Sequence, residues 1–332
     1  MKKVFVAAWI MFAWIGGIES LSAGEDLTNL ISKDAVIVAS IKAGKDDPGV
    51  SYVANIWKEA LKEREKNYTK RQEAIEDIFK QPHLPNVTLA IFGKDIAKLY
   101  ASGGSVSELT SYLILVGVES SDKEFLRSRL DILLQKNEDL KREMFNGEEI
   151  VSNESAGLPR DPSAYVQLGD RTAISPGIER LKDAVNLSKN PKDSIAGLSK
   201  YKDIMSKAAL SGDGQLYIDN RDLLFTNMLR ELEKKWNITL LLAADYVDSI
   251  GVSFDIKDKD SASAMIVFKA KDPGGLEDIK NDARFLGEAI VRKFSQENMQ
   301  HTNSISVSGK YVILELQFKG LEGLWARVLK KE

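Results

Sequence analysis

An internal repeat constrains the fold of this 332-residue chain more than any other feature of its sequence. Residues 177–185 align with residues 320–328, so that glycine, glutamate, leucine and valine coincide. Just upstream, residues 168–174 align with residues 308–313. Each aligned region has the pattern of a strand, a glycine turn, a second strand and a helix. The repeat therefore predicts one supersecondary module that is used twice.

The order of the predicted elements repeats as well. Runs rich in Val, Ile, Tyr and Phe predict strands, and apolar residues at helical spacing predict helices. The first half has a strand at 35–41, a helix from about Ser51 to Phe79, strands at 87–92 and 111–118, a helix at 123–135, a hairpin through Gly169 and a helix from Gly177. The second half has a strand at 215–219, a helix at 223–236, strands at 249–256 and 263–270, a helix at 276–294, a hairpin through Gly309 and a terminal helix.

These patterns predict an α+β protein. It would consist of two tandem, internally duplicated β-α-β-β-α-β-β-α modules, with largely antiparallel sheets that helices cover on one face. The predicted domains are a signal peptide at 1–23, a first repeat at 24–190 and a second repeat at 191–332. Asn146-Gly147 predicts a two-residue hairpin turn. This hairpin has no counterpart in the second half, so we interpret it as an insertion.

The beginning of the chain has the pattern of a secretory signal peptide. Lys2 and Lys3 form a basic start, residues 4–18 carry no charge, and small residues follow up to Ala23. The apolar run is shorter than the roughly 20 residues that a spanning helix needs. We therefore expect cleavage after Ser22 or Ala23, and a periplasmic or extracellular protein without a transmembrane helix. An uncleaved membrane anchor is the alternative.

Composition restricts the function classes further. The chain contains no cysteine, which excludes disulfides, thiol nucleophiles and a lipid-modified N-terminal cysteine. Its 46 basic and 49 acidic residues alternate along the sequence, so we expect no nucleic-acid-binding surface. We interpret the Asn-x-Ser/Thr triplets as chance matches in a bacterial protein. These triplets begin at Asn67, Asn86, Asn153, Asn186 and Asn237.

Several loose motifs follow one another along the chain, at residues 31–36, 170–175, 194–197 with Tyr201, and 214–219. Their order resembles exported bacterial proteins that carry a domain of unknown function and have a duplicated α+β architecture. The resemblance covers most of the mature chain. It implies a compartment and an architecture, and it implies no site residue.

The residue types that most site chemistries need are scarce. His83 and His301 are the two histidines, and both fall in predicted connections, which is too few ligands for the usual zinc site. The Gly103-Gly104-Ser105 segment lacks the Lys-Ser/Thr ending of a P-loop, and Gly274-Gly275 is typical of the start of a helix. Residues 255–260 are acidic but lack the glycine and closing glutamate of a calcium loop, so we interpret them as a hairpin turn.

Trp57, Trp236 and Trp325 each lie on an apolar helix face, which favours core packing over a sugar or lipid platform. The sequence therefore predicts no catalytic, cofactor-binding or metal-ligating residue, and no cofactor. We expect a non-catalytic binding or scaffolding role at the cell envelope, with a protein or envelope component as the partner. Exposed connections such as residues 93–110 would carry the contacts. A carboxylate-dependent hydrolase and a carrier of an apolar ligand are the alternatives.

Overall fold

The structure, a computed structural model, describes two compact units of the chain, and the division falls between Lys202 and Asp203. We call the described residues up to Lys202 the first unit and those from Asp203 the second unit. The predicted signal peptide, the predicted helix from Ser51 to Phe79 and most of the predicted terminal helix lie outside the described residues. The described ranges are 27–41, 86–101, 111–117, 123–134, 140–153, 163–208, 214–236, 243–258, 260–295 and 299–321.

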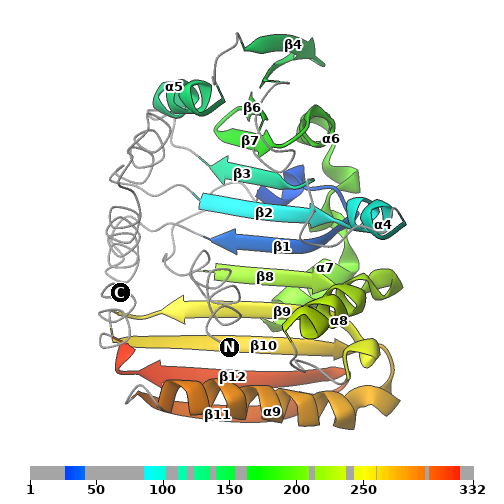
Figure 1. Cartoon of the computed structure of the whole chain (residues 1–332), viewed down its shortest axis with the longest axis vertical. Helices are drawn as coiled ribbons and strands as arrows, with labels where there is room; N and C mark the ends of the chain where they lie inside the picture. Colours follow the sequence, from blue (N-terminus) through cyan, green and yellow to red (C-terminus); the bar gives the residue numbers. More distant parts are fainter. Residues whose placement is uncertain are drawn as a thin grey trace. The chain divides into compact units, whose positions relative to one another are not determined.

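The described strands of the first unit pair antiparallel in the order β1-β2-β3-β7-β6-β5-β4 (Figure 1). Most of them coincide with the predicted strands to within two residues at each end. The strands are β1 (Ala35–Ile41), β2 (Asn86–Phe92), β3 (Leu113–Gly117), β4 (Lys141–Phe145), β5 (Glu148–Ser152), β6 (Ala164–Leu168) and β7 (Arg171–Ser175). The helices are η1 (Leu27–Leu30), α4 (Gly93–Ala101), α5 (Lys123–Leu134), α6 (Ile178–Lys189), η4 (Pro191–Asp193) and η5 (Ile195–Gly197).

The described strands of the second unit pair antiparallel in the order β8-β9-β10-β12-β11. These strands are β8 (Gly214–Asp219), β9 (Val247–Ile256), β10 (Ser261–Ala270), β11 (Gln300–Ser308) and β12 (Tyr311–Lys319). The helices are α7 (Ser199–Lys207), which spans the division, η6 (Arg221–Leu223), α8 (Leu224–Trp236), η7 (Ala244–Tyr246), η8 (Pro273–Gly275) and α9 (Leu276–Ser295). The mixed α+β class and the antiparallel pairing agree with the prediction.

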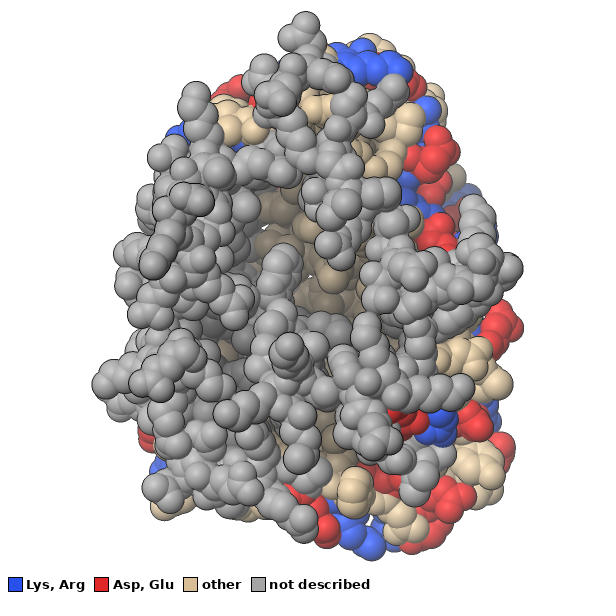
Figure 2. Space-filling model, in the orientation of Figure 1, with Lys and Arg blue, Asp and Glu red and all other residues tan. Residues whose placement is uncertain are grey.

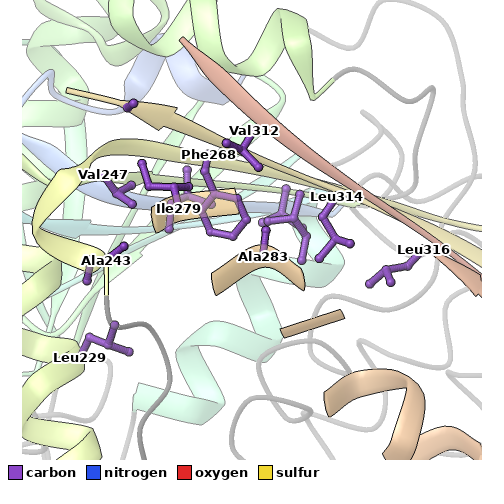
Figure 3. Close-up of a cluster of buried hydrophobic side chains, with 14 residues drawn as sticks. Leu229, Ala243, Val247, Phe268, Ile279, Ala283, Val312, Leu314 and Leu316 are labelled. Carbon is purple, nitrogen blue, oxygen red and sulfur yellow. The ribbon is translucent and has the colours of Figure 1, made fainter. Parts of the chain in front are cut away.

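The core of the second unit lies between α9 and one face of the strands (Figure 3). Ile279 and Ala283 of α9 are buried against Phe268 of β10 and Leu314 of β12. Each large apolar side chain buried in this way contributes about 1.5–3 kcal/mol relative to an exposed one. The alternating apolar residues of each strand supply this core because successive side chains point to opposite faces.

Helix α7 packs on the opposite face of the same strands. A Cβ added to Gly251 of β9 would lie 3.0 Å from the Cβ of Ala208 and 3.1 Å from Cγ1 of Ile204. Gly251 alternates with Ile250 and Val252, which face the α9 side. The prediction that helices cover a single face is therefore wrong for this unit, because a strand with small residues on its second face admits a helix there.

The first unit is also buried on both strand faces. Helix α5 packs on one face, where Val116, Tyr165 and Ile174 form a cluster with the leucines of α5. Val166 and Ala173 alternate with these residues and are fully buried as well. Their burial also contradicts a single covered face. Strands that are buried on both faces have nearly continuous apolar runs instead of alternation.

The glycine turns behave as their sequences predict. Asn146 and Gly147 have φ values of 49° and 85°, and they connect β4 and β5 through the Phe145↔Glu148 pair. Two positive φ values in a two-residue loop are the signature of a type I′ turn, so the predicted hairpin is confirmed. Gly169 and Gly309 have φ values of 66° and 60° at the β6–β7 and β11–β12 turns.

Two predicted connections are corrected by the structure. Gly93–Ala101 forms helix α4 instead of an exposed connection, and its Ile96 is fully buried. This helix has nine residues, which is less than three turns, and so short a segment is difficult to distinguish from a connection by its periodicity. His301 lies inside β11 instead of in a connection. The sequence shows alternation only in the second half of this strand, at Ile305 to Ser308, and the polar residues before it give no such signal.

Candidate functional site

Several residues that the sequence singled out have ordinary structural roles. Asp258 closes the β9–β10 turn, where its carboxylate accepts hydrogen bonds from the backbone N–H groups of Asp260 at 2.7 Å and Ser261 at 2.8 Å. The hydrogen bond from the Ser261 hydroxyl, followed by these backbone hydrogen bonds, holds the pKa of Asp258 below its usual value. Asp272 accepts a hydrogen bond from the N–H of Gly274 at 2.8 Å and caps η8, the 3-10 turn that leads into α9. The acidic segment is therefore a turn and the Gly-Gly segment the start of a helix, as predicted.

Other residues that the sequence singled out lie outside the described ranges, namely Trp57, His83, Gly103 to Ser105 and Trp325. Among the glycosylation triplets, Asn153 has only 3% of its surface exposed. Its side-chain N–H donates to the carbonyl of Leu134 at 2.7 Å. A glycan cannot reach such an amide in the folded protein, which supports the interpretation of this triplet as a chance match.

Arg180 is the centre of an ionic cluster in the first unit. Its Nε donates to Asp95 at 3.1 Å, and its Nη2 contacts the same carboxylate oxygen. Its Nη1 lies 3.1 Å from Asp183 and 3.7 Å from Asp34. The guanidinium carbon also lies 3.9 Å from the centre of the Phe92 ring, a cation–π distance. Each guanidinium nitrogen thus has an acidic partner, and the side chain is only 13% exposed.

This cluster links segments that are distant in sequence. Asp34 precedes β1, Asp95 lies in the first turn of α4, and Arg180 and Asp183 belong to α6. The hydroxyl of Ser111 also donates to Asp95, at 2.8 Å. Burial raises the pKa of Asp183, and the adjacent Arg180 partly offsets that effect. Because the guanidinium of Arg180 already pairs with the carboxylates around it, the cluster is better explained as a set of ion pairs that holds α6, α4 and the start of β1 together than as a reactive site.

A second cluster joins α7 to the strands of the second unit. Lys269 Nζ lies 2.7 Å from Asp203 and 4.0 Å from Asp248, and the Tyr311 hydroxyl lies 2.7 Å from both carboxylate oxygens of Asp203. The ammonium of Lys207 lies 5.7 Å from the centre of the Tyr311 ring.

The hydrogen bonds of this cluster fix its protonation state. Hydrogen bonds from Lys269 and then Tyr311 hold the pKa of Asp203 below its usual value. Burial, and then the hydrogen bond to Asp203, raises the pKa of Tyr311 to about 12. At neutral pH the carboxylate is ionised and the phenol is protonated. Neither group has a pKa near neutrality, where general acid–base catalysis works best.

Next to this cluster lies an exposed polar surface. Except for the half-buried Ile313, the side chains of β11 and β12 that point away from α9 are hydroxyl, amide or charged groups, and the Ser304 hydroxyl lies 3.2 Å from the carboxylate of Glu315. We call this surface the polar strand face. Its exposed members are Gln300, Thr302, Ser304, Ser306 and Ser308 of β11 and Glu315, Gln317 and Lys319 of β12.

Among the described residues, neither the distribution of charged side chains nor the residues that commonly bind metals indicate another site. In the part of the chain that the structure describes, no group of three or more His, Cys, Asp or Glu residues could hold a metal ion. No described helix is both long and apolar enough to cross a membrane. On the face shown in Figure 2, the described acidic and basic side chains are intermixed.

The comparisons with known proteins identify a family. Residues 53–283 match the family described as "Protein of unknown function (DUF3352)". The chain belongs to this family. The match confirms the expected domain of unknown function. No curated protein and no solved structure matches the chain. In this DUF3352 protein, the two clusters and the polar strand face are the described features that bear on function.

Proposed function

We propose that this chain is an exported protein that binds a neutral, hydroxyl-rich polymer of the cell envelope, a glycan by its chemistry. The polar strand face would bind it, without making or breaking bonds. The export part of the proposal rests on the signal-peptide pattern of residues 1–23. The binding part rests on one observation, the row of exposed hydroxyls along β11.

The chemistry of the row suits a repeating polar ligand. Alternate residues of a strand lie on one face about 6.8 Å apart, so Thr302, Ser304, Ser306 and Ser308 form a regular line. A hydroxyl both donates and accepts hydrogen bonds, and the amide of Gln317 on β12 does the same. A polymer of hydroxyl groups can exchange hydrogen bonds with each of them.

We further propose that the two units arose from one duplicated module. The order β1-β2-β3-β7-β6 in the first unit has the same sequence of connections as β8-β9-β10-β12-β11 in the second. The turns at Gly169 and Gly309, which the repeat aligned, have similar positive φ values of 66° and 60°. The insertion proposed from the sequence corresponds to the β4–β5 hairpin.

The Arg180 cluster bears on the hydrolase alternative. It gathers Asp34, Asp95 and Asp183, and a carboxylate-dependent hydrolase needs two such groups. However, all three carboxylates pair with the guanidinium of Arg180, whose side chain is only 13% exposed, and this pairing holds them away from a substrate. We therefore place binding before hydrolysis.

Co-sedimentation with insoluble envelope glycan tests the binding proposal. We expect the mature protein to pellet with the glycan, and the Thr302→Ala/Gln317→Ala variant to bind about tenfold more weakly, since two hydrogen bonds contribute about 1–2 kcal/mol. The matched control is Glu277→Ala/Lys280→Ala, an exposed ion pair on α9, which should bind normally. Equal binding by both variants would refute the role of this face.

Two further measurements address the other parts of the proposal. The mass of the mature N-terminus should show cleavage after Ser22 or Ala23, and an intact Met1 in a membrane fraction would contradict export. Hydrolysis of the glycan by the protein, abolished in a folded Asp95→Asn variant, would favour the hydrolase instead.

A further inference from the structure

Strand β11 is an end strand that lacks the usual protection of an edge. It is last in the strand order, and among the described strands it pairs with β12 alone. That pairing is unbroken over nine residues, from Gln300↔Lys319 to Ser308↔Tyr311. The strand contains no charged residue and no proline, and its Val307 is 47% exposed. Natural proteins usually protect such edges with charges, prolines, bulges or short strands.

Strand β4, at the end of the strand order of the first unit, shows the contrast. It has five residues, of which Lys141, Arg142 and Glu143 are charged. Charges and short length are the expected protection of an edge strand. Strand β4 therefore has the protection that the described residues of β11 lack.

We propose that β11 pairs antiparallel with β11 of a second copy of this chain, about a twofold axis at Ser304. Centring the axis there uses the whole strand, because Gln300 then faces Ser308 of the second copy and Thr302 faces Ser306. Hydroxyl and amide groups face each other on one side of the pair, and such cross-strand pairs contribute about 0.2–1 kcal/mol each. No like charges oppose each other, which is what a strand that pairs with itself requires.

The backbone geometry is compatible with this axis. In the two-residue turn at Gly309, Ser308 and Tyr311 form the hydrogen-bonded pair that closes the hairpin. Every second residue of β11 counted back from Ser308, which includes Ser304, therefore directs its backbone N–H and C=O groups toward β12. The backbone groups of Asn303, Ile305 and Val307 then point to the open edge. Across the proposed interface, the two Ser304 residues form a non-hydrogen-bonded pair, with Cα atoms about 4.5 Å apart.

Helix α9 adds a second layer to the proposed interface. It lies over β11 and β12 (Figure 1). The helix comes close to β11 at Gly287, where an added Cβ would lie 3.3 Å from Nδ2 of Asn303. A twofold axis at the strand centre places the two copies of α9 antiparallel on the same side of the sheet. Arg284 and Glu288 are exposed on either side of Gly287. The arginine of one copy then comes next to the glutamate of the other, so their charges are complementary.

The oligomeric state of the mature chain tests this proposal, and the test requires no envelope ligand. Size-exclusion chromatography with light scattering should give twice the chain mass at micromolar concentration. Ser304→Lys should give the mass of one chain, because two ammonium groups would meet at the axis. Within one copy, that lysine faces Glu315, which favours correct folding. Ser188→Lys, which adds the same charge on the exposed surface of α6 in the first unit, should remain a dimer.

A cross-linking experiment tests the register. The chain has no cysteine, so an introduced one is unique. Ser304→Cys should form a disulfide-linked dimer on mild oxidation, because a separation of about 4.5 Å lies within the range of disulfides. Ser306→Cys should not, because in this register its counterpart is four residues away, about 13 Å. A monomeric unmodified chain, a Ser304→Lys dimer, or equal cross-linking of both cysteine variants would each overturn the proposal.

Discussion

Replacing Asn220 with alanine should destabilise the second unit through a buried hydrogen-bond network. Asn220 follows β8, and only 2% of its surface is exposed. Its side-chain N–H groups lie 2.8 Å from the carbonyl of Val247, 3.1 Å from that of Ala244 and 2.9 Å from the hydroxyl of Thr226. Its Oδ1 accepts from the backbone N–H of Thr226 at 3.0 Å. One amide thus connects β8, the first turn of α8 and η7.

The size of the effect follows from the groups that lose a partner. In Asn220→Ala, the Thr226 N–H and the Val247 carbonyl each lose a hydrogen bond in a buried site. Each lost buried hydrogen bond of this kind costs about 1–3 kcal/mol. We therefore expect the free energy of unfolding to fall by about 2–4 kcal/mol. Ala244 is less affected because its carbonyl still accepts from the Thr226 hydroxyl at 3.1 Å.

Urea unfolding followed by circular dichroism measures this loss, and hydrogen exchange locates it. Asn281→Ala, on the exposed surface of α9, is the control and should change stability by less than about 0.5 kcal/mol. Asn220→Asp keeps the acceptor but places a carboxylate against two carbonyl oxygens, so it should cost more than alanine. Equal unfolding midpoints for the alanine variants at Asn220 and Asn281 would refute the network as a source of stability.

Three further predictions concern other parts of the structure. Arg180→Met leaves three crowded carboxylates without their cation, and it should lower the free energy of unfolding of the first unit by about 3–5 kcal/mol at neutral pH. In urea titrations, Gly251→Ala should cost about 1–3 kcal/mol because α7 must move. Gly117→Ala, whose added Cβ has no neighbour closer than 3.6 Å, should not. The pKa of Asp203 is lowered in the fold, so its stabilising effect is present above its unfolded pKa and is lost as the pH falls through the folded value. The pKa of Tyr311 is raised to about 12, so its contribution is complete below about pH 10 and is lost on going to pH 12. Burial also raises the pKa of Tyr165 and Tyr217, so the readout is the change between the two proteins. Ultraviolet absorbance should show that Asp203→Asn shifts the titration of one tyrosine to lower pH, and an unshifted titration would contradict the cluster.

Local signals in the sequence were sufficient for many of the elements. The predicted strand at 35–41 has the bounds of β1, and Asn146-Gly147 forms the expected type I′ turn. Such signals depend on residues within one turn or one strand, because periodicity and glycine conformation are local properties. They do not depend on which distant segment packs against the element.

The features that the sequence did not reveal depend on contacts between distant residues. Asp34, Asp95 and Arg180 are separated by many residues, and none is distinctive among the 46 basic and 49 acidic residues of the chain. Asn220 has the appearance of an ordinary loop asparagine, and only its burial shows its role. Gly251 gave no signal of close packing because a glycine in a strand also marks a bulge or a bend. Long-range geometry alone distinguishes these residues from their neighbours.

The proposed duplication gives a reason why one edge is open and its counterpart is not. In the strand orders of the two units, β6 corresponds to β11. The inserted hairpin covers β6, because β5 pairs with it, and the strand order then ends at β4 with its three charged residues. The second unit has no such insertion after α9, so β11 remains available. A strand that pairs with its own copy about a twofold axis uses the β11 edge of both copies. Association through β11 should therefore stop at two copies instead of continuing into a filament.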